Sequence, residues 1–307
     1  MEKTNHHQAL NLRQLCIGYF IYSISIKVLT LPAQLSTSAG NWAWLSTLLG
    51  IIFELLLVIA ASLILKFTDN QNRIFRLTCW VLIPLVIFET VLTAIQVFHL
   101  AYTDLFTNLG ITVFVITLIG LGLFFLTRQP RAVFRAGEIL WLFFALGLVL
   151  AVIPTLYNIK VNWHDLVSGN ARAILPTTLM HLGFFETATF VLAFGSETKK
   201  TNRDLVRINL TALGCGICYA LFMVLFVLLF GNLGRHQTMG IVDMTTAAQF
   251  ITNSGSLDWL IAIAVLSALI LRFGVQLVAI VTLVKRGLNR RWLNAHYITY
   301  GVKNLLS

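Results

Sequence analysis

Charged residues are scarce in this chain. Only 11% of its 307 residues are Asp, Glu, Lys or Arg, which is less than half of the roughly 25% found in soluble domains. Apolar residues make up 58% of the sequence, and they form long runs without the period of two that a transmembrane barrel requires. The composition excludes a soluble globular protein and predicts an integral membrane protein built from helices.

Signatures of catalysis are also missing. The chain has no His-Glu-x-x-His pattern, no Gly-rich phosphate loop and no Gly-x-Ser-x-Gly turn. His6 and His7 are too few to hold a metal ion. The four cysteines lie in or beside apolar runs, so neither a disulfide framework nor redox chemistry at Cys215 and Cys218 is expected. These absences favour a protein that is not an enzyme and needs no cofactor or metal.

Apolar windows of about 20 residues predict eight transmembrane helices in a single membrane domain, residues 1–285, followed by a basic tail at 286–307. The expected spans lie near residues 13–33, 42–66, 77–100, 110–127, 137–157, 175–195, 207–231 and 257–285. Between the last two spans, apolar residues recur at helical spacing and predict a short amphipathic helix on the outer surface: Ile241, Met244, Ala248 and Ile251. The tail lies along the inner interface or is a frayed cationic end.

The net charge of +10 is explained by membrane orientation rather than by nucleic acid. Seventeen basic residues fall in segments on one side of the predicted spans, and three, Lys160, Arg172 and Arg235, fall on the other. Because basic residues are retained on the cytoplasmic side, both termini are predicted to be cytoplasmic in a multi-pass protein of the cell membrane.

Five ionisable residues lie well inside predicted spans: Lys27, Glu54, Glu89, Glu186 and Arg272. Each would cost about 2.5–3.5 kcal/mol at the centre of a lipid-facing helix, so they are expected to face inward. Glu54 is the weakest functional candidate, because its neighbours in sequence are apolar. Glu89 shares a polar helix face with further side chains, namely Thr93, Gln96 and His99.

Lys27 and Glu186 fall in the first and sixth spans, which are equivalent helices if a five-helix unit is repeated with inverted topology. The hydroxyl-rich stretch 22–27 and the stretch around Gly183 both predict an interrupted helix. Interruptions near the midplane free backbone groups for a carboxylate and an ammonium group. The predicted ligand site therefore uses residues of both spans: Ser23, Ile24, Ser25, Lys27, Gly183, Phe184 and Glu186. A polar interior is expected beside this site, formed by Glu89, Gln96 and Arg272. Lys27 and Glu186 are expected to pair with each other or with ligand charges. The alternative is that the charges are internal ion pairs that only fix helix register.

Three segments carry a resemblance to a known family: Arg13-Gln14-Leu15, the run from Ser25 to Pro32, and the run from Ala39 to Leu45. They resemble the amino-terminal signature of the endospore germination permease family, within the amino acid–polyamine–organocation transporter superfamily. Gly183-Phe184-Phe185-Glu186 resembles that family's sixth-helix segment. The similarity runs from about residue 10 to 285, and Ser25 stands where the family often has Gly.

The resemblance implies a fold of two inverted five-helix repeats, here without the last two helices. It also implies a role as the B subunit of a nutrient germinant receptor in the spore inner membrane. Such a subunit is expected to bind a small molecule, an amino acid, and to act with an A-type membrane subunit and a C-type lipoprotein. Two other functions stay open. A proton- or sodium-coupled amino-acid transporter would use an intramembrane carboxylate, and a structural subunit of a membrane complex would use the charges for assembly alone.

Overall fold

The computed structural model describes residues 10–67, 73–105, 111–158, 166, 171–185, 187–195, 202–252 and 257–288. Within these ranges the chain is helical and contains no β-strand. Six helices of the described residues are long and apolar enough to cross a membrane, or seven if one bent helix pair counts as a single span. The prediction of an all-α polytopic membrane protein is confirmed.

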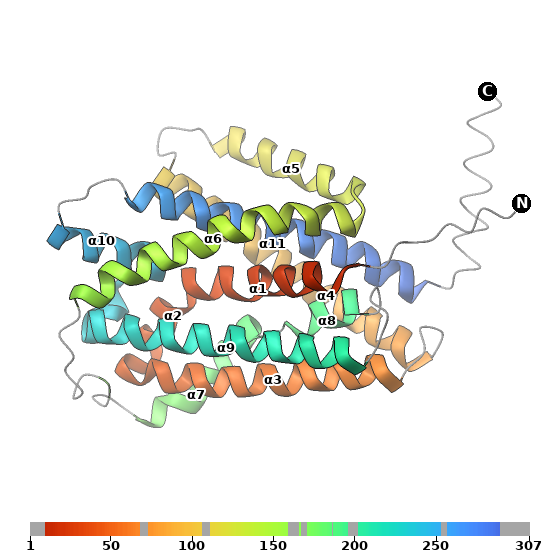
Figure 1. The fold of residues 1–307 in the computed structure, drawn as a ribbon, viewed down its shortest axis with the longest axis horizontal. Coiled ribbons are helices and arrows are strands. Elements are labelled where there is room, and N and C mark those ends of the chain that lie inside the picture. Colours follow the sequence, from red (N-terminus) through yellow and green to blue (C-terminus); the bar gives the residue numbers. More distant parts are fainter. Residues whose placement is uncertain are drawn as a thin grey trace, which may run out of the picture.

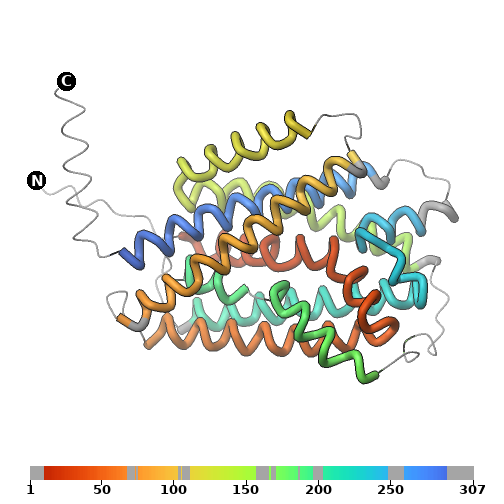
Figure 2. Tube along the Cα trace, turned by 180° about the vertical axis from the view of Figure 1, so that it is seen from behind, coloured from red at the N-terminus to blue at the C-terminus, as the bar shows by residue number. Residues whose placement is uncertain are grey.

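The helices form one bundle with roughly parallel and antiparallel axes (Figures 1 and 2). The long helices are α1 (Leu12–Leu29), α3 (Ala43–Phe67), α4 (Arg73–Leu100), α6 (Pro130–Asn158), α9 (Asn202–Phe230) and α11 (Leu257–Gly287). Shorter helices join or flank them: α2 (Leu31–Ala39), α5 (Ile111–Thr127), α7 (Ile174–Met180), α8 (Ala188–Phe194) and α10 (Gly240–Thr252). At 17 residues, α5 corresponds to the predicted span 110–127 and lies at the edge of the bundle against α11.

Helix ends with basic residues gather at one end of the bundle. The carboxyl ends of α3 and α11 and the amino ends of α4, α6 and α9 all lie there (Figure 1, right-hand side). Basic side chains occur in the first or last turns of these helices, including Lys66, Arg73, Arg131, Arg203 and Lys285. The predicted segregation of basic segments is therefore a feature of the fold, and we call this the basic end.

Helix α1 differs from the prediction. An interruption was expected at Ser23-Ile24-Ser25, but α1 continues without a break from Leu12 to Leu29. The Ser23 hydroxyl accepts a hydrogen bond from the Lys27 ammonium one turn later, so it does not compete for the backbone. The helix ends instead at Thr30, because Pro32 lacks the N–H that would donate to the Val28 carbonyl.

The predicted amphipathic helix exists as α10, but its apolar face does not lie on a membrane surface. Ile241 and Met244 are fully buried, and α10 packs against α6, α11 and α1. The Asp243 carboxylate accepts hydrogen bonds from the backbone N–H groups of Thr238 and Met239, at 2.9 and 2.7 Å, at the start of the helix. The side chains of Ala248 and Ile251 lie outside the described residues, as does the tail beyond 288. Thus α10 closes the end of the bundle opposite the basic end.

Gly240 allows α10 to approach the end of α1. A Cβ atom at this position would lie 2.9 Å from both the Pro32 side chain and the Val28 carbonyl oxygen. We expect Gly240→Ala to destabilise the folded protein by about 1–3 kcal/mol, the usual cost of overpacking, measured as a lower thermal unfolding midpoint in detergent. The control is Gly120→Ala, whose Cβ meets nothing within 4 Å; it should not lower the midpoint. Equal midpoints for the two variants would contradict close packing of α10 on α1.

Candidate functional site

The centre of the bundle holds an ion pair between Lys27 of α1 and Glu54 of α3. The Lys27 ammonium lies 2.6 Å from one carboxylate oxygen of Glu54 and 2.7 Å from the other. Only 2% and 4% of the two side chains is exposed. Two charges in a low-dielectric interior are costly unless they are paired and hydrogen-bonded, so this contact fixes the register of α1 against α3.

Hydroxyl groups complete the surroundings of the pair. Ser23 Oγ accepts a hydrogen bond from Lys27 Nζ at 3.0 Å. On the other side, Thr187 Oγ1 donates to Glu54 Oε1 at 2.6 Å, and Thr187 is itself hydrogen-bonded to the Tyr19 hydroxyl at 2.6 Å. These contacts join α1, α3 and the segment before α8 into one buried network, which we call the Lys27 cluster.

The segment that supplies Thr187 is a broken span. The stretches Ala171–Met180 and Leu182–Phe194 are bent by 64°, so the predicted interruption near Gly183 is present. His181 ends α7, and its backbone N–H donates to the carbonyls of Thr177 and Thr178, both at 3.2 Å. The break turns the Phe185 ring inward, where its centroid lies 5.1 Å from Lys27 Nζ, a cation–π distance.

The partner of Lys27 in the described part of the chain is Glu54. In the sequence, this carboxylate is the weakest functional candidate. The sequence around Glu54 did not reveal this contact, because the polar groups around the carboxylate come from other elements: Ser23, Lys27 and Thr187. Glu186, the predicted partner, lies outside the described residues. Thr187 and Phe185 were missed as site residues, although their positions beside Gly183 and Glu186 in the predicted break were a usable signal.

A second buried cluster lies where α1 meets α4 and α11. Glu89 Oε2 is 3.9 Å from Arg272 Nη2, and it accepts hydrogen bonds from the Tyr22 hydroxyl at 2.6 Å and from Gln276 Nε2 at 3.3 Å. The Arg272 guanidinium also donates to the Tyr22 carbonyl and lies 4.4 Å from the Tyr22 ring centroid. We call this the Arg272 cluster. It brings together Glu89 and Arg272 of the predicted polar interior.

Several buried polar atoms near this junction have no hydrogen-bond partner among the described residues: Ser25 Oγ, Glu89 Oε1, Thr93 Oγ1, Arg272 Nε and Gln276 Oε1. Buried polar groups are normally satisfied by protein or by ordered water. These atoms therefore provide hydrogen-bonding capacity for water or for a polar ligand. Gln96 lies nearer the end of α1, where its Nε2 donates to Thr30 Oγ1 at 3.2 Å.

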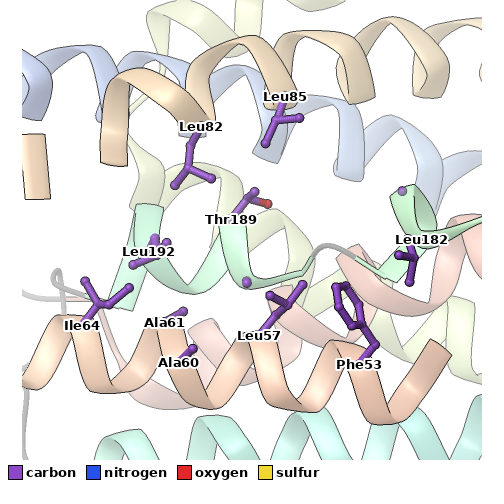
Figure 3. A pocket seen from close by; sticks show the side chains of 12 residues that line it. Phe53, Leu57, Ala60, Ala61, Ile64, Leu82, Leu85, Leu182, Thr189 and Leu192 are labelled. Atoms are coloured by element: carbon purple, nitrogen blue, oxygen red, sulfur yellow. The ribbon is translucent and has the colours of Figure 1, made fainter. Parts of the chain in front are cut away.

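The remaining predicted ligand residues are spread out. Ile24 is buried within the regular helix α1. Phe184 is partly exposed beside the ring of His181. Gly183 lines an apolar groove of about 420 Å³ between α3 and α4, with α8 as its floor (Figure 3). The groove lining is Phe53, Leu57, Ala60, Ala61, Ile64, Leu82, Leu85, Leu182, Gly183, Ala188, Thr189 and Leu192.

Among the described residues, no group of three or more His, Cys, Asp or Glu side chains is placed to hold a metal ion. No protein-family model matches the chain, and no curated protein sequence matches it. The function is therefore argued from the geometry of the site alone: two buried ion pairs lie against two faces of α1, and one of them contacts the broken span.

The strength of the Lys27–Glu54 pair is testable by a double-mutant cycle. We expect Lys27→Met and Glu54→Met each to destabilise the protein by about 3–5 kcal/mol, because each leaves one buried charge unpaired. The double variant should recover most of this loss, since an apolar pair removes both charges. Thermal unfolding in detergent is the measurement.

The control is the partly exposed pair formed by Arg13 and Glu138, which lie 3.2 Å apart with 72% and 22% of their side chains exposed. A Gln at position 138 can still accept the hydrogen bond from Gln14. Replacing both with Gln should change stability by no more than about 1 kcal/mol, as for other surface pairs. If the Lys27→Met and Glu54→Met effects simply add in the double variant, the two residues do not form a coupled pair.

Proposed function

We propose that this membrane protein binds an amino acid at the Lys27 cluster, between α1 and the broken span formed by α7 and α8. The observation that carries this proposal is the buried Lys27–Glu54 pair with its polar surround, next to a helix break. In keeping with the family resemblance, the proposed role is that of a transporter-like B subunit of a spore nutrient germinant receptor, acting with A-type and C-type subunits in the spore inner membrane, with both termini cytoplasmic.

The chemistry of a zwitterion fits this pair. Its carboxylate would take the place of Glu54 beside the Lys27 ammonium, and its ammonium group would take the place of Lys27 beside the Glu54 carboxylate. Each protein charge keeps an opposite charge during this exchange, so no buried charge is left unpaired. Ser23 would retain its hydrogen bond to the Lys27 side chain, because both residues belong to α1.

The break gives the exchange a structural consequence. Thr187 and Phe185 both contact the pair from the segment between α7 and α8. A ligand that separates Lys27 from Glu54 would displace this segment relative to α1 and α3. Binding would then shift the equilibrium between two arrangements of the broken span, as a sensor or a transporter requires.

The test compares binding with stability. In proteoliposomes holding the purified protein, saturable binding of a labelled amino-acid mixture is expected for the parent chain. The stable double variant Lys27→Met, Glu54→Met should bind at least about tenfold more weakly, since a hydrogen bond to a charged group contributes about 1.5–3 kcal/mol. Parent-like binding by this variant would contradict the proposed site, and the surface variant Arg13→Gln, Glu138→Gln should bind as the parent does.

A second candidate function, proton-coupled amino-acid transport, is favoured by one specific observation. Glu89 is 3% exposed, and its Oε1 has no hydrogen-bond partner among the described residues. A buried carboxylate oxygen with free capacity is a place where a proton could be carried through a transport cycle.

For this candidate we expect accumulation of labelled amino acid in proteoliposomes under an inward proton gradient. The double variant Glu89→Gln, Arg272→Gln removes the titratable group without leaving a buried charge unpaired. It should abolish accumulation and leave equilibrium binding intact. Saturable binding without accumulation in the parent protein would favour the receptor role over transport.

A further inference from the structure

A row of buried polar atoms begins at Glu89, where α4 packs against α11. Glu89 Oε1 has no hydrogen-bond partner among the described residues, and neither has Gln276 Oε1. The two side chains are in contact, since Gln276 Nε2 donates to the other Glu89 oxygen at 3.3 Å. Glu89 is 3% exposed and Gln276 is fully buried. Two acceptors with free capacity therefore lie at one level of the bundle.

A second level lies one helical turn further from the basic end. Helix α4 begins at the basic end and α11 ends there, so the two helices run antiparallel (Figure 1). One turn from the Glu89–Gln276 contact, in the direction away from the basic end, are Thr93 on α4 and Arg272 on α11. Thr93 Oγ1 and Arg272 Nε are buried and also lack a hydrogen-bond partner in the part of the chain that the structure describes.

The Thr93 hydroxyl does not bond to its own helix. Other buried threonines donate to the carbonyl four residues earlier, as Thr90 does to Val86 at 2.6 Å and Thr155 does to Ala151 at 2.8 Å. Thr93 makes no such bond, although its side chain is fully buried. Its hydroxyl is therefore available to the space between the helices.

The row continues toward one end of the bundle. Gln96 is partly exposed, its Oε1 is unpartnered within the described ranges, and its Nε2 donates to Thr30 where α1 ends. In the other direction, the inward side chains are apolar: Val86, Leu82 and Cys79 on α4, and Ala279, Ile280 and Leu283 on α11. We call Glu89, Gln276, Thr93, Arg272 and Gln96 the polar row. On α4 it leads away from the basic end for about 10 Å, at about 1.5 Å per residue.

The chemistry of these atoms selects water as the occupant. The free oxygens of Glu89 and Gln276 accept hydrogen bonds, Arg272 Nε can only donate, and the Thr93 hydroxyl does both. A metal ion contacts acceptors alone, and it would add a positive charge beside a Glu89–Arg272 pair that is already neutral. Water donates and accepts, and buried water typically satisfies two to four polar groups of this kind.

We propose that ordered water occupies the polar row and connects Glu89 to the solution at the end of the bundle opposite the basic end. The apolar side chains separate Glu89 from the basic end, so its proton exchanges with one side of the membrane. Among the described residues, the other titratable or charged side chains that contact Glu89 are Tyr22 of α1 and Arg272 of α11. The water path does not require an amino acid at the Lys27 cluster, and its use in transport rests on the proton-coupled function proposed for Glu89.

The experiment uses the full chain in lipid vesicles, mixed briefly with water that carries heavy oxygen and then irradiated. Hydroxyl radicals formed from bound water add heavy oxygen to neighbouring aromatic rings, and mass spectrometry locates the label. We expect label on Tyr22, which contacts Glu89 and is only 3% exposed. The control ring is Phe134, which is 1% exposed and packs against Phe190 and Phe194. Tyr22 labelled no faster than Phe134 would overturn the proposal.

Two matched variants test the direction of the path. Thr93→Leu adds bulk one turn from Glu89 within the polar row, and Val86→Leu adds bulk about one turn from Glu89 on the apolar side, both at buried positions. Thr93→Leu should slow the labelling of Tyr22, and Val86→Leu should leave it unchanged. Equal slowing by both variants, or slowing by Val86→Leu alone, would contradict access from the end opposite the basic end.

A milder pair of variants keeps the test decisive if Thr93→Leu does not fold. Thr93→Val preserves the side-chain size and removes the hydroxyl, so it should slow the labelling of Tyr22 by about fivefold, as expected for one lost hydrogen bond. Thr155→Val should have no effect, because its hydroxyl bonds to Ala151. Amino-acid binding is measured on the same vesicles. Labelled Tyr22 without saturable binding would contradict the Lys27 site alone, and saturable binding without labelled Tyr22 would contradict the water path alone.

Discussion

The contact on which the rest of the bundle depends is the ion pair between Lys27 and Glu54. An unpaired ammonium group in the hydrocarbon core is energetically costly. Here the Glu54 carboxylate compensates the Lys27 charge, and this requires one register of α1 against α3. Once that register is set, Ser23 and Thr187 have their partners within hydrogen-bond distance. The segment before α8 is thereby held against α3, and the break in the span is kept at the level of the pair.

Helix α1 carries polar chemistry on two faces. One face presents Ser23 and Lys27 to α3, and another presents Tyr22 to Glu89 and Arg272. This explains why α1 is buried over most of its length. A helix with charged partners on two sides cannot face lipid on either, so the other helices surround it (Figure 1). Because α1 supplies residues to both the Lys27 cluster and the Arg272 cluster, it connects the two.

Hydropathy was sufficient to predict the fold class. Backbone N–H and C=O groups must be hydrogen-bonded inside a bilayer, and a long apolar run satisfies this requirement by forming a helix. The amphipathic α10 and the break near Gly183 were also predictable, since periodicity and glycine placement are local signals. The partner of Lys27 was not predictable. Pairing depends on the rotation of each helix about its own axis, and the sequence around Glu54 contains no polar neighbour that would reveal the pairing. The interruption expected within α1 is absent for a related reason: hydroxyl side chains at Ser23 and Ser25 weaken a helix only when they bond to the backbone. Pro32, in contrast, removes a donor in every context, and α1 ends before it.

The broken span lies between two environments that do not otherwise meet. On its inner side, Thr187 and Phe185 contact the Lys27–Glu54 pair. On its outer side, Gly183 and Ala188 line the apolar groove. The 64° bend interrupts the span at this level, so the residues after it contact both environments at once. If the proposed binding mode separates Lys27 from Glu54, it acts directly on Thr187 and Phe185, and Ala188 of the groove follows Thr187 in sequence. The energy of the buried ion pair and the packing of the lipid-facing groove are therefore linked through a few residues, and this linkage is the route by which an event at the centre of the bundle would reach its surface.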